Sequence, residues 1–181
     1  MKVSRRNFIR NFGFGLMMIL MSGGRILLCP FEALANSFPS PTKKDRCPVC
    51  GMFVYKYPYW RAGFVFKDGV RVFHCSPKCF FHNLGHVSKY QPVRTREDIK
   101  LLWVTDYYTA NPVDAQDPDV RFVSGSTLVG PMGWDVVPVK GIKAAETFKR
   151  DYFGQKILCL DEVTEEDIEK ARKGGGRKTR Y

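Results

Sequence analysis

The chain has 181 residues, enough for one ordinary domain but not for two full-sized ones. Its composition, 44% hydrophobic and 26% charged, is typical of globular proteins and excludes a disordered or collagen-like chain. Most of the formal charge of +11 lies at the two ends of the chain. Residues 1–35 have five basic side chains and one acidic side chain, and residues 170–181 have six basic side chains and no acidic one. Residues 36–169 carry only +1, so we predict no nucleic-acid partner.

Residues 1–35 resemble a signal of the twin-arginine export pathway. Arg5 and Arg6 precede a mild apolar run over residues 12–21. At about ten residues, this run is well short of the roughly twenty needed to cross a bilayer as a helix. Ala33-Leu34-Ala35 then fits the A-x-A pattern of a signal peptidase site. We therefore expect a periplasmic protein.

Two other readings of this segment stay open. A buried N-terminal helix is the simpler structural alternative. Attachment to the periplasmic face of the inner membrane is the other, because Cys29 has a faintly lipoprotein-like context. Leu28 is larger than the residue that usually precedes a lipidated cysteine.

Cysteine carries the chemistry of the remaining chain. Four of the five cysteines after residue 35 form two close pairs, Cys47 with Cys50 and Cys75 with Cys79. Gly51 follows the first pair and allows a tight turn there. Two such pairs predict a metal site. Disulfides, which an oxidising compartment favours, and a thiol oxidoreductase built on Cys47 and Cys50 are the alternatives.

The segment between the cysteine pairs has the pattern of a β-hairpin followed by a helix. Residues 60–66 are rich in aromatic side chains, a Lys-Asp-Gly turn follows, and residues 70–74 return. Ser76 and Pro77 suit the N-cap and the first helical position, which places Cys79 in the first turn. Unpaired N–H groups and the helix dipole favour thiolates at both Cys75 and Cys79. Together these features predict a treble-clef-like metal-binding segment.

The other patterns predict an α+β fold of small antiparallel sheets with packed helices. The further expected elements are strands at residues 101–105, 121–123 and 156–160, helices over residues 141–153 and after Thr164, and a loop over residues 111–119. We interpret Cys159 as a small buried hydrophobe. The domains are then a signal segment 1–35, a metal-binding domain 36–169 and a basic disordered tail 170–181, which can touch anionic lipid as a peripheral membrane contact.

The remaining metal ligands decide which ion the site prefers. Four thiolates alone suit zinc in a closed site, whereas thioethers shift the preference toward Cu(I). Met52 follows the first cysteine pair, and Met132 lies in a Gly-Pro-Met-Gly turn where a polar residue is expected. His74 and His82 are weaker candidates, because a lone histidine is more often structural than a ligand.

Three stretches together resemble the NosL family, the copper-binding accessory proteins of nitrous oxide reductase: Cys47-Pro-Val-Cys50-Gly-Met52, Gly130-Pro-Met132-Gly133 and a helix through Ala145 and Phe148. The resemblance covers roughly residues 45–163. It implies a Cu(I)-binding metallochaperone, not an enzyme, that delivers copper for assembly of nitrous oxide reductase or a related copper enzyme. It also implies Cys50 and Met132 as copper ligands. The implied partner is a copper-receiving protein or the ABC transporter of that assembly system.

The second cysteine pair departs from the NosL pattern. The stretch Phe73-His-Cys75-Ser-Pro-Lys-Cys79 looks more like the YHS and TRASH metal-binding modules. This extra pair either adds a structural zinc or makes the copper site richer in thiolates. The predicted metal ligands are therefore Cys47, Cys50, Met52, Cys75, Cys79 and Met132, with Cu(I) or Zn as the bound ion. The alternative function is a zinc-binding structural or interaction module.

Overall fold

The computed structural model describes residues 38–173, so the predicted signal segment 1–35 and residues 174–181 of the predicted tail lie outside the described residues. Within the described part, small antiparallel sheets with packed helices confirm the predicted α+β fold. None of the helices in this range combines the length and apolar character needed to span a bilayer.

The first sheet has the strand order β2-β1-β3-β4. Its strands are β1 (Ala62–Phe66), β2 (Arg71–His74), β3 (Ile99–Thr105) and β4 (Pro112–Asp114). The predicted hairpin is confirmed: β1 pairs antiparallel with β2, and Gly69 takes a φ of +86° in the turn. The predicted loop over residues 111–119 is wrong in part, because β4 pairs with β3. Pro112 is tolerated there because it begins an edge strand.

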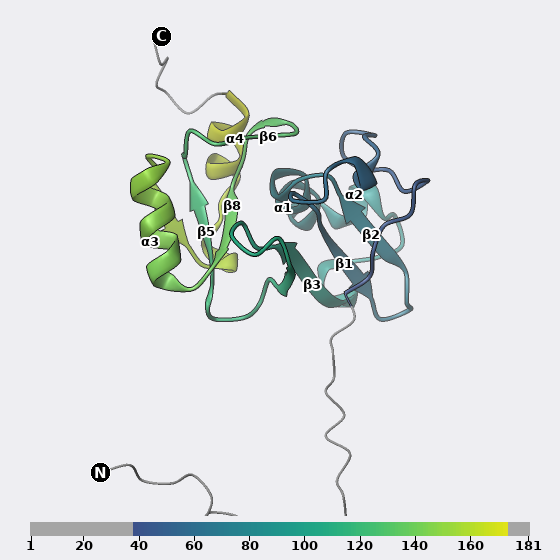
Figure 1. Cartoon of the computed structure of the whole chain (residues 1–181). Coiled ribbons are helices and arrows are strands. Elements are labelled where there is room, and N and C mark those ends of the chain that lie inside the picture. The colour runs from purple at the N-terminus through teal and green to yellow at the C-terminus, as the bar shows by residue number, and fades with distance from the viewer. Residues whose placement is uncertain (1–37, 174–181) are drawn as a thin grey trace, which may run out of the picture. The chain divides into compact units, whose positions relative to one another are not determined.

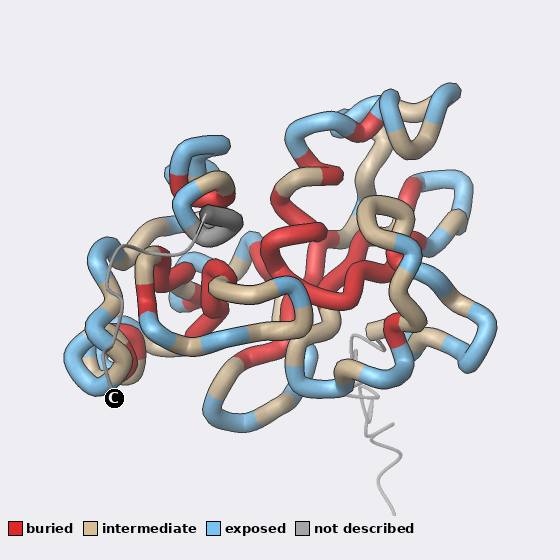
Figure 2. The backbone as a smooth tube through the Cα atoms, turned by 90° about the horizontal axis from the view of Figure 1, so that it is seen from above, coloured by how far each residue is buried: buried red, intermediate tan, exposed pale blue. Residues whose placement is uncertain are grey.

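The helices α1 (Pro77–Gly85) and α2 (Val87–Tyr90) follow the hairpin. As predicted, Ser76 is the N-cap of α1, and its side chain accepts a hydrogen bond from the Cys79 N–H at 3.4 Å. Phe80 and Phe81 of α1 pack in one apolar cluster with Phe64, Leu102 and other residues of the sheet. In space, buried residues gather in the centre of the described part of the fold, and exposed residues lie on the outer loops (Figure 2).

The second sheet has the order β8-β5-β9, with β5 (Val120–Ser124), β8 (Val137–Lys140) and β9 (Lys156–Leu158). The helix α3 (Ile142–Asp151) joins β8 to β9, and a two-stranded hairpin, β6 (Val129–Gly130) with β7 (Gly133–Trp134), lies between β5 and β8. Short 3-10 helices occur at Val54–Lys56, Arg96–Asp98 and Leu160–Glu162.

Alternate residues of β5 face different helices. Phe122 packs against Phe81 of α1, with ring centroids 5.0 Å apart. Val123 points the other way and shares an apolar cluster with Phe148 of α3. The helix α1 therefore contacts both sheets, and α3 covers the outer face of the second sheet (Figure 1).

The two sheets repeat one topology that the sequence does not reveal. In each, the first strand is central (β1 or β5), the second strand (β2 or β8) pairs on one side, a helix follows, and the last strand (β3 or β9) pairs on the other side. The β6–β7 hairpin that carries Met132 is an insertion between the first two strands of the second unit.

The C-terminal helix α4 (Glu165–Lys173) begins as predicted. Thr164 and Asp167 exchange backbone-to-side-chain hydrogen bonds of 3.2 and 3.4 Å, which form a capping box. Ile168 anchors α4 in the main apolar cluster. The helix runs to Lys173, into the range predicted for the tail. The interpretation of Cys159 as a buried residue is wrong: β9 ends at Leu158, and Cys159 is exposed at the start of the next 3-10 helix.

Candidate metal centre

The first cysteine pair lies on a tight turn closed by two backbone hydrogen bonds. The Gly51 N–H donates to the Cys47 carbonyl at 2.8 Å, and the Cys47 N–H donates to the Met52 carbonyl at 2.9 Å. Gly51 has a φ of +76°, a conformation that glycine adopts without strain. The Arg46 side chain donates to the Gly51 carbonyl at 3.0 Å. These bonds direct the side chains of Cys47 and Cys50 to the same side of the turn.

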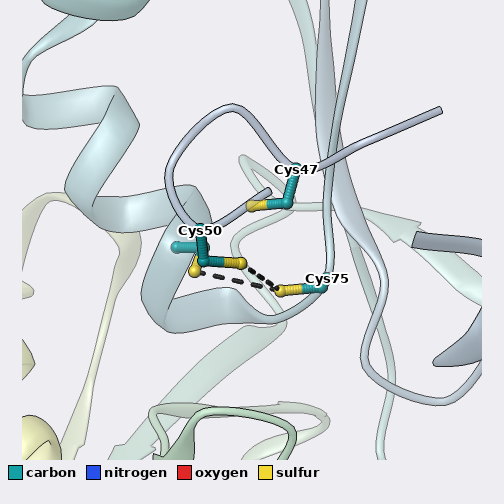
Figure 3. A group of neighbouring side chains, drawn as sticks. Cys47, Cys50 and Cys75 are labelled. Carbon is teal, nitrogen blue, oxygen red and sulfur yellow. Dashed lines mark hydrogen bonds between the residues drawn. The ribbon is translucent and has the colours of Figure 1, made fainter. Parts of the chain in front are cut away.

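The second pair lies where β2 ends and α1 begins. Cys75 follows the last residue of β2, and Cys79 lies in the first turn of α1. The hairpin brings this junction back beside the turn of Cys47 and Cys50. Figure 3 shows the sulfur atoms of Cys47, Cys50 and Cys75 turned toward one another. The structure therefore brings together all four cysteines that the sequence singled out.

The four sulfur atoms have the spacing of a metal-binding cluster. All four Sγ atoms lie within 4.8 Å of one another. The Cys50–Cys75 separation is 3.3 Å and the Cys75–Cys79 separation is 3.9 Å. Four sulfur ligands at about 2.3 Å from one ion stand roughly 3.8 Å apart in a tetrahedron. The donor set thus fits a thiophilic ion after small adjustments, and a 3.3 Å separation is too long for an S–S bond of about 2.05 Å.

An apolar shell encloses three of the four thiols. Cys47, Cys75 and Cys79 are 1%, 0% and 3% exposed, whereas Cys50 is partly exposed. Phe73 and Trp103 close the inner side, with ring centroids 6.2 Å apart. Cys50 is therefore the thiol through which the cluster meets solvent.

The thiols influence one another strongly. Hydrogen bonding with the Cys75 and Cys79 thiols holds the pKa of Cys47 far below its usual value. Hydrogen bonding to Cys47 correspondingly raises the pKa of Cys75 and of Cys79 far above the usual value. Burial raises the pKa of Cys50. Cys47 is therefore the most acidic of the four thiols in the metal-free cluster, whereas the sequence favoured thiolates at Cys75 and Cys79.

The two predicted methionine ligands lie in different surroundings. Met52 is partly buried and packs against the apolar shell of the cysteine cluster. Met132 is 39% exposed, at the tip of the β6–β7 hairpin, and the pairing of Gly130 with Gly133 leaves only Pro131 and Met132 in its turn. This confirms that the turn exposes a thioether, while copper ligation by Met132 stays a prediction.

Lys78 and Asp135 hold that hairpin against the start of α1. The ammonium of the buried Lys78 donates hydrogen bonds to the carbonyl oxygens of Met132 and, at 2.9 Å, of Trp134. The backbone N–H of Lys78 donates to Asp135 Oδ1 at 2.7 Å. Lys78 directly precedes Cys79, so these bonds tether the methionine turn to the helix that carries one of the thiols. Sequence reasoning missed both residues; a lone acid followed by the apolar Val-Val-Pro-Val run was the available signal.

The weaker histidine candidates are not part of the sulfur cluster. His74 is fully buried, and its Nε2 accepts a hydrogen bond from Asn83 at 2.9 Å. Burial lowers the pKa of His74 to about 4, so its imidazole is neutral. His82 points instead to the C-terminal helix, where its Nδ1 lies 3.3 Å from Glu165 Oε1.

Comparison with known proteins agrees with the sulfur-rich site. The NosL family model matches residues 39–168, most of the chain. The chain belongs to the NosL family. Its membership confirms the resemblance inferred from the cysteine and methionine motifs, and it confirms that the protein is not an enzyme.

A solved NosL structure has the same fold. The crystal structure of the copper chaperone NosL from Shewanella denitrificans matches 71% of this chain and 96% of that chain, with a TM-score of 0.58 and 24% sequence identity. A comparison with curated proteins found no match. At this identity, the likeness to the Shewanella protein establishes the shared architecture, while the ligands must be argued from the residues of this chain.

Proposed function

We propose that this protein is a periplasmic Cu(I) metallochaperone that delivers copper for assembly of nitrous oxide reductase or a related copper enzyme. Its membership of the NosL family supports the assignment. The observation that carries it is a donor set made only of sulfur, with four Sγ atoms within 4.8 Å of one another. Thiolates and thioethers select Cu(I) over hard cations.

A chaperone must release its cargo, and the uneven exposure of the cluster provides a route. Cys50 is the thiol at the surface, so a thiolate of a recipient can replace it while the buried thiolates still hold the ion. Met132, exposed on a hairpin tethered to α1, offers a neutral ligand that leaves readily. We propose Cys50 and Met132 as the exchanging ligands. Cys47, Cys75, Cys79 and Met52 are the other donors, and because one Cu(I) takes at most four ligands, only some of these six sulfur atoms bind it at any one time.

The decisive measurement is Cu(I) binding in competition with a chromophoric Cu(I) chelator. We expect about one Cu(I) per chain. Cys50→Ser and Met132→Leu should each weaken binding roughly tenfold, because each removes one of a few soft ligands, with unchanged circular dichroism. Cys159→Ser is the matched control, since Cys159 is exposed and lies outside the cluster. Parent-like binding by Met132→Leu would show that the thioether is not a ligand.

Localisation rests on residues 1–35. Replacing Arg5 and Arg6 together by lysine should keep the charge of the segment but stop export through the twin-arginine pathway. Mass spectrometry of the periplasmic protein should give a chain beginning at Asn36. A chain that keeps Cys29 and partitions with the inner membrane would instead support anchoring at its periplasmic face.

The recipient we propose is a copper-receiving protein or the ABC transporter of the nitrous oxide reductase assembly system. Direct transfer is tested by mixing Cu(I)-loaded protein with candidate recipients in the presence of excess chelator. A true recipient acquires copper despite the chelator, because the ion passes between ligands without being released. Transfer no faster than release to the chelator would count against that recipient.

A zinc-binding structural module is the second candidate, and one observation favours it. Three of the four thiols are almost fully buried, as in closed structural zinc sites. Metal analysis of protein from cells supplied with both metals separates the two functions. Zinc that resists a Cu(I) donor and whose removal unfolds the chain would favour the structural module; exchange for Cu(I) with the fold intact favours the chaperone.

A further inference from the structure

A second group of metal-binding side chains lies between α1 and α4, apart from the cysteines. His82 on α1, His86 at its C-terminal end and Glu165 at the start of α4 each offer one ligand atom, and these atoms lie within 4.8 Å of one another. The chain has only three histidines, and the third, His74, is fully buried. Both accessible imidazoles of the protein therefore meet at one point, beside a carboxylate.

Hydrogen bonds already orient the group. His86 Nδ1 lies 3.1 Å from the His82 carbonyl oxygen, which accepts its proton, so Nε2 of His86 keeps its lone pair for a metal. An imidazole that donates to a backbone carbonyl through its other nitrogen is the usual arrangement around metal-bound histidine. His82 Nδ1 lies 3.3 Å from Glu165 Oε1. At this separation both atoms can bind the same metal ion in place of the hydrogen bond between them.

The helices that carry the group are capped and packed into the fold. Thr164 and Asp167 cap α4, and Ile168 anchors it in the main apolar cluster, so Glu165 projects from a secured first turn. The Tyr90 ring lies edge-on to His82, with centroids 5.9 Å apart. A nearby cation, Arg96, is engaged by Asp161 at 3.0 Å. Packing of the helices that carry these side chains restricts the group before an ion binds, which lowers the entropic cost of binding one.

We propose that His82, His86 and Glu165 form a second, surface metal site that binds Cu(II). Two imidazole nitrogens and one carboxylate oxygen are borderline-to-hard ligands, and Cu(II) binds such sites most tightly among the divalent first-row ions. The donor set differs in kind from the sulfur cluster, which prefers Cu(I). The site goes beyond the proposed chaperone function and does not depend on it, because it shares no ligand with the cysteine cluster.

Electron paramagnetic resonance of Cu(II) tests this site directly. The test uses the purified protein with Cys29→Ser and Cys159→Ser and its cysteine cluster saturated with Cu(I), so that no free thiol reduces the added ion. One equivalent of Cu(II) should give a single signal with splitting from two nitrogens. His82→Gln and His86→Gln should each remove one nitrogen and weaken binding about tenfold or more, and Glu165→Gln should weaken it several-fold.

Glu166→Gln is the matched control, because Glu166 is the neighbouring carboxylate and pairs with Lys170 at 2.6 Å instead of joining the group. It should bind Cu(II) as the parent does. Thermal unfolding gives an independent readout: Cu(II) should raise the melting temperature of the parent but not of the His82→Gln, His86→Gln double variant. With the cysteine cluster loaded with Cu(I), a Cu(II) signal that is the same in parent and double variant overturns the site.

Discussion

Lys78 of α1 and Met132 of the β6–β7 hairpin are joined by a hydrogen bond from the Lys78 ammonium to the Met132 carbonyl oxygen. The same ammonium donates to the Trp134 carbonyl at 2.9 Å, and Lys78 is only 6% exposed. A buried cation is tolerated here because the ammonium donates to two carbonyl oxygens and interacts electrostatically with the Asp135 carboxylate. The lysine side chain and the Asp135 carboxylate together hold the exposed thioether near the start of the helix that carries Cys79.

Lys78→Met should release the hairpin while keeping the apolar stem of the side chain. We expect the free energy of unfolding to fall by about 1–3 kcal/mol, because hydrogen bonds from a charged group are lost. Cu(I) affinity should fall to the level of Met132→Leu, and the double variant should lose no more than either single one. Lys140→Met, at an exposed lysine paired with Asp117, is the control and should leave affinity unchanged. Additive losses would mean that Lys78 does not act through Met132.

Asp135→Asn should change the pH dependence of stability. Burial raises the pKa of Asp135 to about 6, from 3.8. Between these values the folded chain binds more protons than the unfolded chain, so this carboxyl makes stability fall as pH rises. Burial of His74, whose pKa falls from 6.5 to about 4, has the opposite effect over nearly the same range. The two contributions largely cancel in the parent.

The variant removes only the Asp135 contribution, and Asn retains an oxygen that accepts from the Lys78 and Val136 N–H groups. Its stability should therefore rise between pH 4 and 6.5, relative to the parent, by up to about 3 kcal/mol. Urea unfolding of metal-free, reduced protein at several pH values measures this. Parallel curves for parent and variant would show that Asp135 has the same pKa in the folded and unfolded chains.

Metal binding to all four thiols should release protons. The pKa values of Cys50, Cys75 and Cys79 are raised, whereas that of Cys47 is lowered by hydrogen bonding with Cys75 and Cys79. A metal that takes four thiolates should therefore displace about three protons per ion, and affinity should rise with pH. Titration in weakly buffered solution with a pH indicator counts them. Release of about one proton would indicate that Cu(I) uses only one of the protonated thiols.

Gly51→Ala should strain the turn that carries Cys47 and Cys50. Gly51 has a φ of +76°, and a Cβ there would touch nothing within 4 Å, so the expected loss of about 1–2 kcal/mol comes from the backbone alone. Gly69→Ala is the matched control. Gly69 has a φ of +86°, and a Cβ there would also touch nothing within 4 Å, but it lies in the β1–β2 turn. Both variants should lose similar stability, while only Gly51→Ala weakens metal binding. Equal metal affinity in the two would show that the strained turn does not position the thiols.

Local features of the site were predictable because neighbouring residues set them. Ser76 and Pro77 begin α1 as their cap and φ preferences require, and Gly51 takes the positive φ that the C-x2-C turn needs. The hairpin between β1 and β2 then returns the chain, so the four cysteines meet through short-range structure. The prediction that Cys159 is buried was wrong because nothing near it in sequence shows that β9 ends at Leu158, two residues before the predicted end at residue 160.

The sulfur-rich donor set, the resemblance to NosL and the order of strands and helices around the cysteines can all be read from the amino-acid sequence. Which distant groups support that chemistry depends on how the helices and sheets pack. Lys78 meets Asp135 across 57 positions of sequence, and His82 meets Glu165 across 83. Such contacts arise because α1 packs against both sheets and α4, and apolar burial is not directional, so no local pattern specifies which polar residues are brought together.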